Sequence, residues 1–113
     1  MKRSHKLFAE DILDAIEKIN RYINGFSYDD FVENEMVIDA VIRNLEVIGE
    51  AAKNISEKDQ KNYSTIPWKR MIGLRNIVIH GYFGIDLAII WEIITRNLPE
   101  TKPLIVEMLK KGK

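Results

Sequence analysis

The spacing of apolar residues predicts helices along the first half of the chain. In residues 5–23 apolar side chains recur every three or four positions, with charged side chains between them, which is the pattern of an amphipathic helix. The apolar set in residues 30–55 is wider than one stripe, so this stretch is predicted to be a central helix packed on more than one side. Gly49 within it costs about 1 kcal/mol relative to alanine, which a close approach of a neighbouring helix backbone would explain.

The second half continues in helical segments divided by proline and glycine. Residues 56–65 are polar and predict a connector with a short helical turn. Pro67 suits the first turn of the next helix, because that turn does not use the missing N–H, and Gly81 is expected to end it. Further helical segments are predicted over 87–98 and 100–110, with a proline between them. Strand-like alternation never persists, so the fold is predicted to be all-α, with four long helices and room for a short fifth.

Length and composition narrow the class of protein. The chain has 113 residues, which fits a single domain over 1–113. It has no cysteine, which excludes disulfides, thiolate zinc sites and a cysteine nucleophile. No apolar run approaches the roughly 20 residues of a membrane helix, and an acidic, amphipathic segment follows the basic start, unlike a signal peptide. An intracellular protein without a membrane partner is therefore expected.

The zero net charge conceals an uneven distribution. Residues 1–50 carry 6 basic and 11 acidic side chains, whereas residues 51–113 carry 11 basic and 6 acidic ones. A uniformly basic nucleic-acid-binding surface is excluded. Two interpretations stay open for the cations in the middle of the chain, a local basic surface or scattered solvated side chains; these residues are Lys53, Lys58, Lys61, Lys69, Arg70 and Arg75.

The candidate chemistry lies in the stretch Leu74–Gly84, where polar groups stand among apolar ones. On an ideal helix Asn76 and His80 share a face one turn apart, with Arg75 beside them. A histidine can move a proton near neutral pH, and an arginine can hold phosphate oxygens and stabilise transition-state charge. These groups, with Tyr82, suit work on a phosphodiester. The alternative is that Arg75 and His80 bond the last helix carbonyls while Tyr82 packs.

Other polar residues receive structural interpretations. His5 precedes the first helix in a polar context and is expected to be exposed and without a function. Asn44 is in line with apolar positions of the central helix, so it is predicted to be buried and to need a hydrogen-bond partner. Arg43 and Glu50 belong to a polar ridge of mixed sign on the same helix, and such ridges are usually solvated.

The motif Arg75-Asn76-x-x-x-His80-x-Tyr82 resembles the R-x4-H-x-Y motif of HepT-like toxins of the DUF86 type, a branch of the HEPN ribonuclease superfamily. The similarity extends over the chain. The segment Ala40–Ala52 resembles the central helix of that family, and two further segments resemble its flanking signatures, Ile66-Pro67-Trp68 and His80–Asp86. The resemblance implies an antiparallel HEPN-type helical bundle.

The resemblance further implies a metal-independent endoribonuclease without a cofactor, the toxin of a type VII toxin–antitoxin pair in a prokaryotic cytoplasm. Its substrate would be RNA, either tRNA or mRNA. His80 would activate the 2′-hydroxyl or protonate the leaving oxygen, Arg75 would hold the phosphate, and Asn76 would orient either. The products would be a 2′,3′-cyclic phosphate and a 5′-hydroxyl. Because one copy lacks a second acid–base group, a homodimer with paired motifs in a shared cleft is expected.

The resemblance implies a separate role for Tyr82, as the site at which an MNT-type nucleotidyltransferase antitoxin attaches AMP. The added phosphate and bulk beside Arg75 and His80 would compete with RNA. Arg43 and Glu50 are candidates for supporting that site, with dimer contact or helix pairing as the alternative.

Two other functions stay open. The first is a non-catalytic HEPN subunit that binds nucleotide or assists a nucleotidyltransferase. The second is a helical interaction protein whose apolar surface serves only dimerisation.

Overall fold

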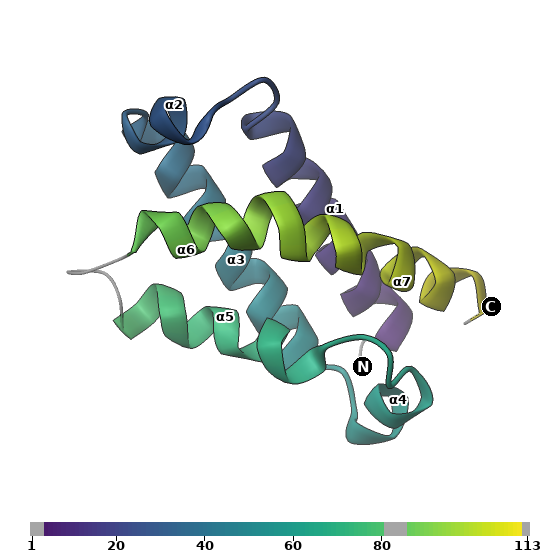
Figure 1. The fold of residues 1–113 in the computed structure, drawn as a ribbon. Helices are drawn as coiled ribbons and strands as arrows, with labels where there is room; N and C mark the ends of the chain where they lie inside the picture. The colour runs from purple at the N-terminus through teal and green to yellow at the C-terminus, as the bar shows by residue number, and fades with distance from the viewer. Residues whose placement is uncertain (1–3, 81–85, 112–113) are drawn as a thin grey trace.

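The computed structural model describes residues 4–80 and 86–111, with the side chains of all of these except 77–80. Every regular element in these ranges is helical, which confirms the all-α class (Figure 1). The elements are α1 (His5–Tyr22), α2 (Tyr28–Val32), α3 (Glu35–Lys53), α4 (Glu57–Asn62), α5 (Trp68–His80), α6 (Leu87–Glu92), the π-helical segment η1 (Ile93–Asn97) and α7 (Leu98–Lys111).

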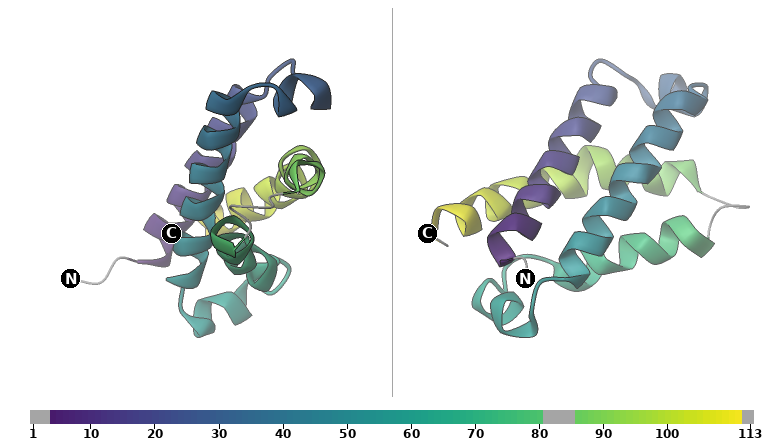
Figure 2. Two further views of the ribbon diagram at one scale, coloured as in Figure 1. Left: turned by 90° about the vertical axis from the view of Figure 1, so that its left-hand side faces the viewer. Right: turned by 180° about the vertical axis from the view of Figure 1, so that it is seen from behind.

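Two layers of helices enclose the core. Helices α1 and α3 lie side by side, and α5 and the continuous rod α6–η1–α7 pack against one side of that pair (Figure 2). Helix α3 contacts α1, α2 and α5, so the prediction of a central helix packed on more than one side is confirmed. The largest fully buried side chains come from α1, α2, α3 and the α6–η1–α7 rod and are Phe31, Ile12, Ile16, Ile19, Leu45, Ile48, Ile90, Ile94, Ile105, Met108 and Val41.

The close helix approach predicted at Gly49 is confirmed. A Cβ atom built on Gly49 would lie 3.0 Å from the backbone nitrogen of Arg75, 3.1 Å from its Cβ and 3.2 Å from the carbonyl oxygen of Met71. Helices α3 and α5 therefore meet backbone to backbone at this point. The contact fixes where Arg75 lies relative to α3.

The segment predicted as one helix over 30–55 is two helices, because two capping sequences compete within it. Ser27 and Asp30 form a reciprocal capping box that begins α2, with N···O distances of 3.0 and 3.2 Å. The Asn34 side chain then accepts a hydrogen bond from the backbone N–H of Val37 at 3.0 Å, which caps a new helix. Gly25, with a φ of 79°, ends the preceding turn.

The predicted break between 87–98 and 100–110 is absent. Helix α6 continues through η1 into α7, although Pro99 and Pro103 remove the hydrogen bonds that α-helical residues would send to the carbonyls of Thr95 and Pro99. The π-helical turn ends at Asn97, two residues before Pro99, and such turns take up irregular backbone bonding without ending a helix. Asp86 caps α6, accepting from the N–H groups of Ala88 and Ile89 at 3.0 and 3.4 Å.

The two helical glycines provide a matched test of the α3–α5 contact. Gly49→Ala should lower the free energy of unfolding by about 1–3 kcal/mol, because the added methyl meets backbone that cannot move aside. Gly73→Ala should raise it by up to about 1 kcal/mol, because a Cβ there meets nothing within 4 Å. Chemical denaturation of both variants measures the difference. Equal stabilisation by both substitutions would contradict the close contact.

Candidate functional site

Arg75 lies at the edge of the buried face of α5. Trp68, Met71 and Leu74 form that face and are buried. The Trp68 indole N–H donates to the carbonyl oxygens of Gln60 and Tyr63 at 3.2 and 3.1 Å, which anchors the start of the helix. Held in this way and by the contact at Gly49, the Arg75 side chain remains 37% exposed. Its backbone is therefore held against α3, while part of its side chain is accessible.

Arg75 borders a groove of about 450 Å³ between α1, α3 and α5. Apolar side chains from α1 and α3 line part of it, and charged or amide side chains line the rest. The lining residues are Phe8, Asp11, Arg43, Glu46, Val47, Glu50, Ala51, Asn54 and Arg75. An exposed groove of mixed charge can hold a polar ligand, with Arg75 available at one wall.

Glu50 pairs with one edge of the Arg75 guanidinium. Its Oε2 lies 3.4 Å from Arg75 Nε, and the two side chains are 54% and 37% exposed. Exposed pairs of this kind contribute about 0–1 kcal/mol to stability, so the main consequence is orientation. Because the carboxylate occupies the Nε edge, the two terminal nitrogens remain for a bidentate contact with an anion such as phosphate.

The other candidates around this groove are placed differently. Arg43 lines the groove, but its guanidinium pairs with Glu46 at 3.6 Å. Asn76 is exposed on the next position of α5. His80 is the last residue of α5, but its side chain lies outside the described residues, as does the whole of Tyr82. The predicted grouping of Arg75 with His80 and Tyr82 therefore stays a prediction.

Three polar groove residues, Asp11, Glu46 and Asn54, are not among the site candidates predicted from the sequence. Glu46 lies on α3 and Asn54 directly follows that helix. With Glu50 they recur every fourth position, and such residues share a face of a helix. That spacing was the available signal. Asn44 has the structural role predicted for it: it is buried, and its Nδ2 donates to the Ala40 carbonyl oxygen at 2.9 Å.

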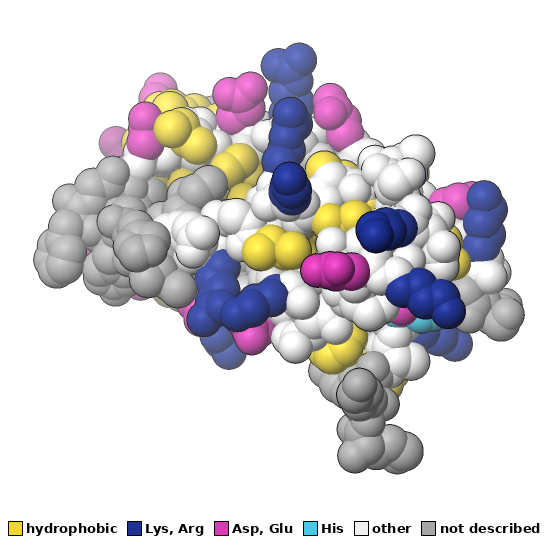
Figure 3. Space-filling model, turned by 90° about the horizontal axis from the view of Figure 1, so that it is seen from below, with side chains coloured by type: hydrophobic (Ala, Val, Ile, Leu, Met, Phe, Trp, Pro, Cys, Tyr) yellow, Lys and Arg dark blue, Asp and Glu magenta, His cyan; other side chains and the backbone are white. Residues whose placement is uncertain are grey.

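The face formed by α4 and α5 is rich in cations. Residues 53–75 contain six basic and two acidic side chains. Seen from below, Lys and Arg side chains are spread over this side of the molecule (Figure 3). The basic side chains of α4 and of the start of α5 are exposed, and acidic and apolar side chains stand among the cations visible on this side.

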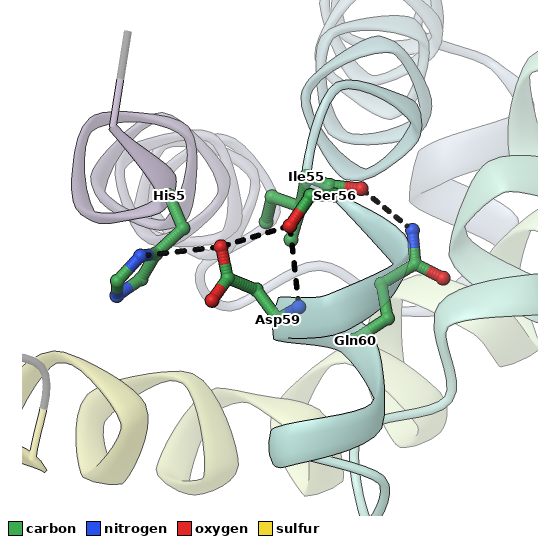
Figure 4. Close-up of polar contacts among 5 residues, drawn as sticks. All are labelled: His5, Ile55, Ser56, Asp59 and Gln60. Atoms are coloured by element: carbon green, nitrogen blue, oxygen red, sulfur yellow. Dashed lines mark hydrogen bonds and ion pairs between the residues drawn. The ribbon is translucent and has the colours of Figure 1, made fainter.

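The expectation that His5 is exposed was wrong. Its side chain is only 26% exposed, and Nδ1 lies 3.4 Å from Asp59 Oδ2 (Figure 4). The Ser56 hydroxyl donates to the same Asp59 oxygen at 3.0 Å. The reason is tertiary, because α4 folds back against the start of α1 and brings these residues together. The histidine joins two elements and lies outside the groove.

Neither a metal-binding cluster nor a membrane-spanning helix is found among the described residues. No three His, Cys, Asp or Glu side chains in the described part of the chain are grouped so that they could hold a metal ion. Among the helices described, none combines the length and apolar character needed to cross a membrane.

These features define an all-helical bundle with an accessible arginine at the crossing of two helices, beside a charged groove. The chain belongs to the Ribonuclease HepT-like family, whose model matches residues 12–108.

The chain is similar over most of its length to proteins from several prokaryotes. It is 42% identical to "Putative RNase MJ1380" of Methanocaldococcus jannaschii, covering 89% of this chain and 93% of that protein. It is 41% identical to "Probable ribonuclease HepT" of Thermococcus cleftensis, over 90% and 93% of the two chains. It is 39% identical to "Putative RNase TTE0752" of Caldanaerobacter subterraneus subsp. tengcongensis, over 94% and 95%. No solved structure matches this chain.

Proposed function

We propose that this protein is a metal-independent endoribonuclease and the toxin of a type VII toxin–antitoxin system in a prokaryotic cytoplasm. Its family and the names of its relatives support a ribonuclease. The observation that carries the proposal is Arg75, whose backbone is held by the α3–α5 contact and whose partly exposed side chain pairs with Glu50 through Nε. The arrangement suits a scissile phosphate. One domain over residues 1–113, with no cofactor, is part of the same proposal.

The reaction follows from the groups in the motif. A base removes the proton of the ribose 2′-hydroxyl, the 2′-oxygen forms a bond to phosphorus, and the bond from phosphorus to the 5′-oxygen breaks. An acid gives the leaving oxygen its proton, which yields the cyclic phosphate and the 5′-hydroxyl. His80 serves as one of these two groups, Arg75 neutralises the charge on the phosphate, and Asn76 orients His80 or the substrate.

Two proton transfers need two groups, and each chain offers one histidine in the motif. A homodimer related by a two-fold axis would bring a second His80 to the same strand. This requirement supports the dimer, with the scissile phosphate between the two copies.

Glu50 supports the reaction as a positioning residue, because it contacts Arg75 and leaves the terminal nitrogens free. Arg43 supports the groove more distantly through its pair with Glu46. Tyr82 is the modification site in this proposal, where an MNT-type nucleotidyltransferase antitoxin transfers AMP from ATP to the phenol and releases pyrophosphate. The attached nucleotide would compete with tRNA or mRNA for Arg75.

One observation favours the non-catalytic alternative, a subunit that binds nucleotide or assists a nucleotidyltransferase. Three carboxylates, those of Asp11, Glu46 and Glu50, line the groove beside Arg75. Carboxylates repel a polyanionic RNA strand at short range. Intact RNA in the presence of purified protein that binds a mononucleotide would favour this alternative.

The wild-type protein should cleave RNA in the presence of EDTA, whereas His80→Ala and Arg75→Ala should each lower the rate at least about a hundredfold, as loss of a proton-transfer or charge-stabilising group does. His5→Ala and Arg96→Ala are matched controls that should retain cleavage. Gel analysis of RNA fragments measures the rates, and end-group analysis should find cyclic phosphates. Undiminished cleavage by His80→Ala would disprove the mechanism.

Glu50→Gln should lower kcat about tenfold while KM changes less than twofold, because a misdirected guanidinium loses transition-state contacts before it loses ground-state binding. Glu50→Asp should recover part of the rate. Glu46→Gln, on the same groove but paired with Arg43, should retain the wild-type kcat. An equal loss of kcat in Glu46→Gln would show that the effect comes from the negative charge of the groove and not from the Glu50–Arg75 pair.

Coexpression with a cognate MNT-type nucleotidyltransferase should add one AMP-sized mass to the protein and abolish RNA cleavage, because the added phosphate competes for Arg75. Tyr82→Phe should prevent the addition, whereas Tyr63→Phe should not. Intact-mass analysis and peptide mapping give the result. An addition at another residue would refute this part of the proposal.

A further inference from the structure

We propose that a basic corner, where α3, α4 and α5 meet, binds the phosphate backbone of single-stranded RNA and directs the strand to Arg75. The inference rests on the proposed function and identifies the surface that holds the substrate. The corner consists of five exposed side chains, Lys53, Lys58, Lys61, Lys69 and Arg70.

Hydrogen bonds bring the three helix ends together. The Gln60 side chain donates to the Ile55 carbonyl oxygen at 2.9 Å, which joins α4 to the segment that follows α3. The Trp68 indole donates to the carbonyl oxygens of Gln60 and Tyr63, which joins α4 to the start of α5. Lys58 and Lys61 are three positions apart on α4, and residues at that spacing are neighbours on a helix surface. The corner therefore has a fixed frame.

The cations of the corner are unneutralised. None of the five makes an ion pair with a described residue, whereas some cations elsewhere pair with acids one turn away, as Lys18 does with Asp14 at 3.3 Å and Lys111 with Glu107 at 3.7 Å. Asp59, which is next to Lys58, is bonded to Ser56 and faces His5 instead (Figure 4). The corner keeps a positive potential, which attracts a polyanion.

Two of these cations lie where they do not stabilise the fold. Lys69 and Arg70 lie in the first turn of α5, which contains no acidic residue. Cations at a helix N-terminus oppose the helix dipole and cost about 0.3–1 kcal/mol each. Binding of an anion offsets that cost, because the dipole and the side chains then attract the same phosphate groups.

The exposed side of α5 connects the corner with the candidate catalytic residues. On an ideal α-helix Lys69 and Asn76 differ by about 20° around the axis and about 10 Å along it. A strand held at the corner can therefore run along α5 to Asn76 and Arg75 without entering the carboxylate-lined groove.

Reversing the charge of the corner tests whether RNA binds at this surface or is attracted only by the net charge of the protein. The double variant Lys58→Glu/Lys61→Glu is compared with Lys18→Glu/Arg21→Glu, which changes net charge equally at the far end of α1. Fluorescence anisotropy with a fluorescein-labelled 20-nucleotide single-stranded RNA gives Kd between 50 and 200 mM salt. The corner variant should bind at least about tenfold more weakly, and its salt slope should fall by about 1.4, or 0.7 for each lost phosphate contact. The control should change Kd less than twofold.

A charge-removing variant and a DNA probe test the same surface. Lys58→Gln/Lys61→Gln, which removes charge without reversing it, should lower the salt slope equally with a smaller loss of affinity, and circular dichroism checks its folding. Single-stranded DNA of the same sequence should lose affinity to the same extent, because the contacts are to phosphate. An unchanged slope and Kd in both corner variants would overturn the inference even if the wild type cleaves RNA. The inference would also be overturned if the corner and control variants lost RNA affinity equally. It would likewise be overturned if the corner variants bound RNA normally and lost only the binding of an acidic protein.

A failure of the proposed function has a different signature. If wild-type protein leaves RNA intact but binds it, and the corner variants alone lose that binding, the corner is a nucleic-acid surface on a non-catalytic protein. If the wild type cleaves RNA, the KM of the corner variants should rise by the same factor as Kd.

Discussion

The contact between α3 and α5 at Gly49 is the constraint on which the candidate site depends. The two backbones approach until a single methyl group would lie 3.0 Å from the Arg75 nitrogen. A guanidinium on a long side chain would otherwise sample many positions. The close contact holds its base, and Glu50, one residue from Gly49, holds one edge of its tip. One position on α3 thus brings α5 close, and the next aligns its arginine.

Apolar packing stabilises the fold, whereas the polar pairs mainly orient side chains. Burial of apolar side chains from all the long helices stabilises the fold. The ion pairs around the groove are exposed and contribute little to stability. Their main effect is on orientation, because each carboxylate pairs with one nitrogen of an arginine. Polar groups can therefore serve chemistry on this fold without a large stabilising or destabilising effect.

Charge is organised on two sides of Arg75. The groove between α1, α3 and α5 contains carboxylates, whereas the corner formed by the ends of α3, α4 and α5 presents unpaired cations. An RNA strand would be attracted by one surface and repelled by the other. This polarity explains how a protein with zero net charge can belong to a ribonuclease family and still present a surface suited to a polyanion.

Local spacing in the sequence determined the all-α class, the amphipathic α1 and the family motif around Arg75, because these depend on neighbours within a few positions. Sequence could not show that Pro99 leaves the last helix continuous, that Asn34 starts a new helix, or that His5 meets Asp59. Tertiary structure alone paired Glu50 with Arg75, 25 positions apart, and gathered the basic corner. Such contacts depend on which helix faces meet, and that choice follows from packing of the whole core rather than from any single segment.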